Sequence, residues 1–177
     1  MKNGIFKKVI SVALVIMLAV SLVGCVDPEP SKEIGNTSSA ASEKIKEQTF
    51  SLNETAVFNT LKITATEIKE STGSTYFKAE EGKVFVGVNF TVENISNEEQ
   101  AVSSILLFDA YVDDVACDLS FTASAAFDGG TIDGTIASGK KLVGWYAVEV
   151  PANWAELELN VKANWLSNTS AKFVFNK

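Results

Sequence analysis

The feature that most constrains the fold is a regular alternation of residue types between Lys83 and Asn94. One set of alternate positions is entirely apolar and comprises Val84, Val86, Val88, Phe90 and Val92. The other set is mostly polar or small and comprises Phe85, Gly87, Asn89, Thr91 and Glu93. Successive side chains of a β-strand point to opposite faces, so this period of two predicts a strand with one face in a core.

Further strands are predicted by similar runs in the second half of the chain. They cover residues 61–66, 105–112, 142–150, 156–162 and 173–175. Turn residues separate them, among them Asn94–Asn97, Asp113-Asp114, Asp128–Gly130, Asp133-Gly134 and Ser138-Gly139. Seven or eight short strands joined by polar turns, with no amphipathic helix of useful length, predict an all-β fold, an antiparallel β-sandwich.

The first 25 residues have the three parts of a secretion signal. Lys2, Lys7 and Lys8 precede an almost wholly apolar run from Val9 to Val20, which is short for a bilayer-spanning helix. The run is followed by Leu22-Val23-Gly24-Cys25, which resembles the lipobox of bacterial lipoproteins. That resemblance implies cleavage before Cys25 and lipidation of its thiol. The alternatives are an ordinary signal peptide and an uncleaved anchor helix.

These observations divide the chain into a signal peptide (residues 1–24), a lipidated cysteine with a flexible linker (25–49) and one sandwich domain (50–177). The linker holds Pro28 and Pro30 among mostly polar residues, which bury too little apolar area to order it. A coil of this length spans roughly 25 Å on average. We expect an extracytoplasmic monomer held by the lipid on Cys25 at the outer face of the cell membrane.

Charge and residue usage exclude several classes of function. The chain has 15 lysines, no arginine, 22 acidic residues and no histidine. Removal of residues 1–24 leaves 12 lysines and a net charge of −10, which argues against a nucleic-acid partner. Without histidine there is no Ser-His-Asp or Cys-His catalytic arrangement. Cys117 is the one thiol left after lipidation and lies in an apolar run, so we expect a small core residue rather than a nucleophile.

The strand and turn pattern also resembles a known group. A strand ends in Val92-Glu93-Asn94, a hairpin follows at Asp113-Asp114, a turn contains Ser138-Gly139-Lys140, and a strand closes on Val148–Pro151. This pattern resembles the immunoglobulin-like domains of unknown function found on Gram-positive lipoproteins. They are similar in fold to the secreted immunoprotective antigens of mycobacteria. The resemblance implies an immunoglobulin-like sandwich and a surface location, but no reaction.

Two surface features are candidate sites. Strand parity places Trp145 opposite the core face of its strand, and Phe85 does the same on its own strand, so we expect an exposed aromatic binding surface. The alternative is that the segment Ser120–Ile136 covers this face. Trp154 and Trp165 lie near strand ends and are expected to pack. The second feature is a set of carboxylates that suits calcium as a cofactor and comprises Asp109, Asp113, Asp114, Asp118, Asp128 and Asp133. The alternative is that these residues form turns.

The sequence therefore favours a non-enzymatic binding domain for an envelope or surface protein. A calcium-stabilised extracellular module is the alternative. A cell-envelope hydrolase is third, because acids are plentiful but nothing in the sequence pairs two of them across a cleft.

Overall fold

The computed structural model describes residues 31–32, 48–167 and 169–177. The predicted signal peptide, Cys25 and most of the predicted linker lie outside the described residues. Within the described part of the chain, no helix is long and apolar enough to cross a membrane.

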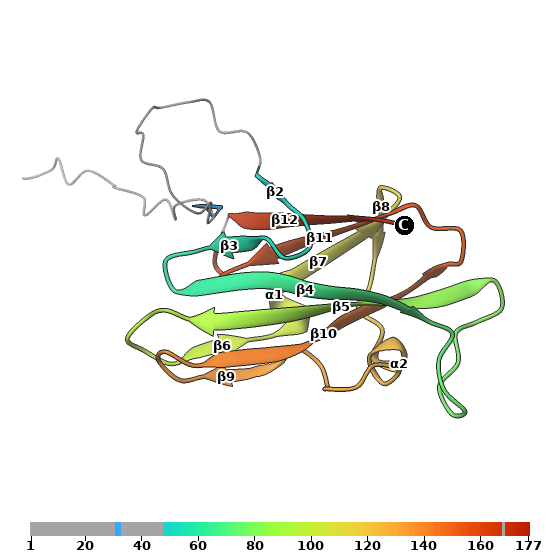
Figure 1. The fold of residues 1–177 in the computed structure, drawn as a ribbon, viewed down its shortest axis with the longest axis horizontal. Coiled ribbons are helices and arrows are strands. Elements are labelled where there is room, and N and C mark those ends of the chain that lie inside the picture. Colours follow the sequence, from blue (N-terminus) through green and yellow to red (C-terminus); the bar gives the residue numbers. More distant parts are fainter. Residues whose placement is uncertain (1–30, 33–47, 168) are drawn as a thin grey trace, which may run out of the picture.

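Two five-stranded sheets face each other (Figure 1). The first, sheet A, has the order β1(Ser31–Lys32), β3(Thr55–Val57), β4(Leu61–Ser71), β5(Lys83–Asn94), β10(Lys141–Pro151). The second, sheet B, has the order β2(Thr49–Phe50), β12(Ser170–Asn176), β11(Glu156–Lys162), β7(Phe108–Val112), β8(Val115–Cys117). A third pair joins β6(Gln100–Val102) to β9(Gly134–Ile136). All described strand pairs are antiparallel except β2 with β12, so the predicted antiparallel β-sandwich is confirmed.

The main core lies between the two sheets and uses the face predicted from the alternation in β5. Val86, Val88, Phe90 and Val92 are buried there. Sheet B contributes the matching alternate residues of β11 and β12, including Leu157, Leu159, Val161, Phe173 and Phe175. Phe90 packs edge-on against both Phe108 and Phe173, at centroid distances of 5.2 and 5.5 Å. Aromatic contacts between the sheets therefore hold the centre of the sandwich.

A second, smaller core covers the outer face of sheet A, which corrects the expectation of an exposed aromatic surface. Phe85 is fully buried and Trp145 is 4% exposed. They pack with Ala147 of β10 and with Ala123 and Phe127, which lie in and just after the short helix α2(Phe121–Ser124). Strand parity gives the direction of both side chains correctly. The predicted exposure is wrong because the segment that follows β8 folds back over this face.

Two contacts fix that covering segment on the sheet. The Trp145 indole Nε1 donates a 2.7 Å hydrogen bond to the carbonyl of Asp128, and its ring stacks on Phe127 at 4.9 Å. Gly87 of β5 lies directly beneath Phe127, and a Cβ at this position would come within 2.7 Å of that ring. Because Gly87 has no side chain, the Phe127 ring can pack closely against the backbone of β5.

The predicted strand over residues 105–112 is only partly formed. A single helical turn, α1(Ser104–Leu107), precedes β7. Asp133 accepts hydrogen bonds from the Ser104 backbone amide (2.8 Å) and from the Ser104 hydroxyl (2.8 Å), which holds the start of this turn. The turn leaves Ile105 and Leu106 exposed, at 66% and 59%.

Candidate functional site

The predicted calcium ligands are dispersed rather than gathered. Asp109 pairs with Lys162 at 2.8 Å, and Asp133 binds Ser104. Asp113 accepts hydrogen bonds from the amides of Ala155 (3.0 Å) and Glu156 (2.9 Å). The described residues contain no group of three or more acidic or cysteine side chains placed to hold a metal ion.

Asp113 and Asp114 form the tight turn between β7 and β8. Both have a positive φ, 49° and 66°, as a two-residue hairpin of this type requires. Aspartate tolerates this conformation better than most residues. The predicted alternative, that aspartates serve turns, therefore describes what this pair does in the structure.

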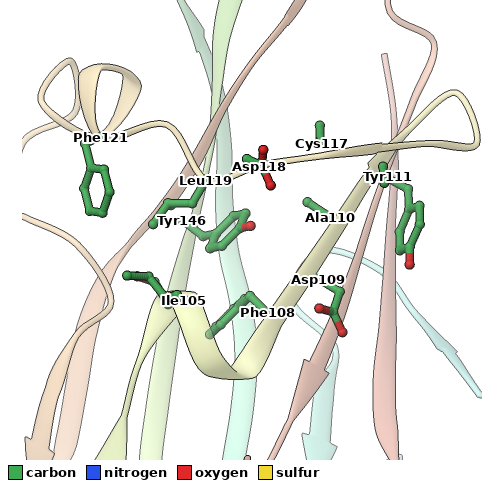
Figure 2. A pocket seen from close by; sticks show the side chains of 12 residues that line it. Ile105, Phe108, Asp109, Ala110, Tyr111, Cys117, Asp118, Leu119, Phe121 and Tyr146 are labelled. Carbon is green, nitrogen blue, oxygen red and sulfur yellow. The ribbon is translucent and has the colours of Figure 1, made fainter.

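A hollow lies at one side of the sandwich, between the edge strands β8 and β10. Strand β7 pairs with β11 from Phe108 to Val112, but with β8 only from Ala110 to Val112. After Cys117 the chain leaves sheet B and crosses to sheet A, where Leu119 forms a bridge to Val148. β7 and the crossing segment therefore diverge, and Figure 2 shows Tyr146 lying in the space between them.

We call this space, together with an adjoining hollow, the edge cleft. The first hollow has a volume of about 380 Å³ and is lined by residues that include Ile105, Phe108, Cys117, Phe121 and Tyr146. The adjoining hollow, about 300 Å³, is lined by Val112, Val115, Val150 and Pro151, among others. Ala116 and Cys117 line both, so the two hollows meet at β8. Each volume is within or close to the range of small-ligand and side-chain pockets.

The rim of the edge cleft is unusually apolar for an exposed surface. Ile105, Val115 and Phe121 are each between 66% and 68% exposed. They come from α1, β8 and α2: Ile105 and Phe121 line the first hollow, and Val115 lines the adjoining one. Single exposed apolar residues are common on soluble proteins, but a group of them around a hollow is typical of a binding site.

Burial controls the chemistry of the two polar groups inside the cleft. Burial, with a smaller contribution from the neighbouring Asp118 carboxylate, raises the pKa of the Cys117 thiol to about 11. Burial also raises the pKa of the Tyr146 phenol well above its usual range. Both groups are therefore neutral at physiological pH. Since a thiolate is the reactive form of cysteine, Cys117 acts here as a small apolar residue.

Four carboxylates line the edge cleft, Asp109 and Asp118 in the first hollow and Asp113 and Glu149 in the adjoining one, and they differ in their partners. Asp109 is held by Lys162, whereas Asp118 is exposed and lies on the crossing segment. Together with the negative charge expected of the mature chain, they favour a ligand with a positive charge beside its apolar part.

One sequence signal for this site lies in the segment predicted as a strand over residues 105–112. Ile105-Leu106-Leu107-Phe108 is a run of four apolar residues in a region of alternation. A half-buried strand cannot place four consecutive apolar side chains on one face. In the structure α1 resolves the run by burying Leu107 and Phe108 and exposing Ile105 and Leu106. Phe121 carried no such signal, because its exposure depends on where the crossing segment leads.

Comparison with known proteins places the chain in a family. The family described as Domain of unknown function (DUF4352) matches residues 50–172, and the chain belongs to this family. No curated protein matches the chain.

Several solved structures share the fold. A candidate lipoprotein of Bacillus subtilis (ycdA) is 18% identical with a TM-score of 0.56; the match covers 67% of this chain but only 37% of that protein. An uncharacterised β-sandwich protein of Clostridium difficile is 16% identical, with coverage of 78% and 99% and a TM-score of 0.50. The yjhA protein of Bacillus subtilis is 17% identical, with coverage of 70% and 96% and a TM-score of 0.51. At these identities the likeness concerns the fold alone.

Proposed function

We propose that this DUF4352 protein is a lipid-anchored, non-enzymatic binding module on the outer face of a Gram-positive cell membrane. Its ligand is an extended polypeptide segment of an envelope or surface protein, bound in the edge cleft. The observation that carries the proposal is the edge cleft between β8 and β10, whose two hollows are lined by the exposed apolar residues Ile105, Phe121 and Val115.

The backbone at the cleft supports an extended ligand. β8 is the last strand of sheet B, so its outer edge has no strand partner in the described chain. The two-residue turn makes Val112 and Val115 a hydrogen-bonded pair. In an antiparallel ladder the next residue of β8, Ala116, therefore directs its N–H and C=O away from β7, toward the free edge. A peptide lying along this edge can pair with Ala116, in the mode of strand addition.

The side chains of the cleft support an apolar ligand. The two hollows that meet at Cys117 receive alternate residues of an extended segment, whose side chains lie about 7 Å apart along one face. Burying a phenylalanine or leucine side chain contributes about 1.5–3 kcal/mol. Two such anchors contribute about 3–6 kcal/mol, which is less than the roughly 8 kcal/mol of a micromolar complex, so backbone pairing along β8 and further contacts have to supply the rest and the cost of association.

Membrane anchoring rests on the signal at residues 1–25 and is tested separately. We expect the mature protein to carry diacylglycerol on Cys25, observed as a mass increase on the N-terminal peptide. We expect the Cys25→Ser variant to leave the membrane fraction. An unmodified N-terminal peptide in the membrane-bound protein would contradict the lipoprotein assignment.

The cleft is tested by selecting binders from a random-peptide library displayed on phage, with the mature protein as the target. We expect selected peptides to contain alternating apolar residues and a basic residue. Phe121→Glu and Ile105→Glu should each weaken their binding by about 30-fold, the effect of losing about 2 kcal/mol at an interface hot spot.

Val143→Glu is the matched control, because Val143 is also exposed (54%) and apolar but does not line the cleft. It should leave peptide binding unchanged. The proposal fails if the library yields no binder, or if selected peptides bind the Phe121→Glu and Ile105→Glu variants as well as they bind the unchanged protein.

A further inference from the structure

The chain joins the sandwich very close to the predicted lipid. Strand β1 pairs with β3, and its first residue, Ser31, lies opposite Val57. Cys25 precedes Ser31 by six residues. Six residues span at most about 20 Å when fully extended. A lipid on Cys25 therefore keeps Ser31 within about 20 Å of the bilayer surface.

Ser31 also fixes which end of the sandwich faces the membrane. Val57 immediately precedes the turn between β3 and β4, whose residues Phe58, Asn59 and Thr60 line a hollow of about 120 Å³. The other side of that hollow is formed by the connection between β11 and β12, through Ala163, Asn164, Ser167 and Thr169. In Figure 1 the short blue strand β1 and the start of β12 lie at the same end.

This connection presents two large apolar side chains to solvent. Trp165 is 68% exposed and Leu166 is 69% exposed. The expected packing role is therefore correct for Trp154, which is 3% exposed, but wrong for Trp165. Ile95, 41% exposed, lies at the same end, because its amide donates a hydrogen bond to the Thr60 carbonyl at 2.9 Å.

Local hydrogen bonds shape the loop that carries these side chains. The Asn164 side chain accepts a 3.0 Å hydrogen bond from the Leu166 amide, and the Asn164 carbonyl accepts one of 3.1 Å from the Ser167 amide. The turn is closed by its own polar groups, so the backbone needs no contact from Trp165 or Leu166. Both side chains remain free to contact another surface.

We propose that this end of the sandwich docks on the bilayer, with Trp165 and Leu166 inserted at the lipid headgroup boundary. The proposal rests on the lipid anchor of the proposed function. Tryptophan is enriched at membrane interfaces, where its ring is apolar and its indole N–H stays hydrated. A tether of at most about 20 Å keeps the loop at a high local concentration near the lipid. Weak insertion of two side chains is then sufficient for docking.

Docking at this end gives the domain a defined orientation. The register places Leu61 beside Asn94 at the docked end and Ser71 beside Phe85 near the other. β5 has 12 residues and spans about 40 Å. Tyr76, 89% exposed in the connection between β4 and β5, therefore lies at the end farthest from the membrane. It provides a distal control position.

The test attaches the protein to phosphatidylcholine vesicles through Cys25, using a maleimide phospholipid and a Cys117→Ser background so that Cys25 is the sole thiol. Vesicles containing brominated phosphatidylcholine quench indole fluorescence on contact. We expect brominated lipid to quench part of the emission of the tethered protein. The same lipid should quench none of the emission of the Trp165→Phe variant, since Trp145 and Trp154 are buried.

The control moves the reporter to the far end, as Tyr76→Trp in the Trp165→Phe background, and we expect no quenching there. Docking is disproved if brominated lipid leaves the tethered protein unquenched, or if it quenches the distal reporter equally. Because the tether is made chemically, this result does not depend on lipidation in cells. Failure of the lipoprotein assignment appears instead as an unmodified Cys25, and failure of the cleft appears in the peptide selection.

Discussion

Truncation of Trp145 tests the second core directly. The side chain is 96% removed from solvent, stacks on Phe127 and donates a hydrogen bond to the Asp128 carbonyl. A tryptophan side chain buries about 200 Å², which at about 25 cal/mol per Å² corresponds to about 5 kcal/mol as an upper bound. Measured costs of replacing buried aromatic residues by alanine are about 3–5 kcal/mol. We therefore expect Trp145→Ala to lower the free energy of unfolding by about 3–5 kcal/mol.

Trp145→Phe separates packing from hydrogen bonding. Phenylalanine keeps an aromatic ring against Phe127 but cannot donate to the Asp128 carbonyl. Since a single hydrogen bond contributes about 1 kcal/mol net, we expect a cost of about 1–2 kcal/mol, including the small loss of volume.

Urea denaturation followed by far-ultraviolet circular dichroism measures both variants, because this signal does not depend on the tryptophan removed. Val143→Ala on the same strand is the matched control. Its side chain is exposed, so its cost should lie within about 0.5 kcal/mol of zero. If Trp145→Ala cost less than about 1 kcal/mol, the covering segment would not be packed on sheet A and the burial argument would be refuted.

Further predictions concern Gly87, Cys117 and Asp113. Gly87→Ala should lower the free energy of unfolding by about 1–3 kcal/mol in urea denaturation, because the new Cβ meets the Phe127 ring at 2.7 Å; an unchanged free energy of unfolding would contradict this contact. Cys117 should be alkylated slowly by iodoacetamide at pH 7, with a rate that rises up to about pH 11; a plateau near pH 9, the ordinary thiol value, would contradict its burial. Because the pKa of Cys117 is higher in the folded protein, its contribution to stability is complete below pH 9 and is lost as the pH rises through about 11. A Cys117→Ser variant should lack this loss of stability between pH 9 and 11 in pH-dependent melts. Asp113→Ala should cost about 1–3 kcal/mol, since it removes the acceptor for two amides and puts alanine at a positive φ, whereas Asp113→Asn should cost less; equal costs would show that the hydrogen bonds contribute nothing.

The sequence predicted the faces of the central strands well, because a period of two leaves little freedom when one face is buried. The alternation in β5 assigned Val86 to Val92 to the main core, and parity placed Trp145 on the opposite face. The alternation did not show whether the face of sheet A that carries Trp145 is exposed to solvent. That depends on the path of residues 118–132, whose small and polar residues contain no periodic signal.

The edge cleft was beyond sequence reasoning for a related reason. It exists because β8 ends after three residues and the chain then crosses to Val148 of the other sheet. Such a departure is a long-range event, and no local spacing encodes it. Ile105 and Phe121 become neighbours of one opening through this crossing, although 16 residues separate them.

The two-residue ladder between β1 and β3 also has a mechanical consequence. A force on the lipid end of the chain acts first on this ladder, which is much shorter than the 11-residue β10 that closes sheet A. Detachment of Ser31–Lys32 would shift the point of attachment to Thr49 in β2, and the contour length from Cys25 would rise from about 20 Å to about 80 Å. The domain would then have two possible distances from the bilayer, a short one at rest and a longer one when the chain is pulled, without any change in the remaining strands of the two facing sheets.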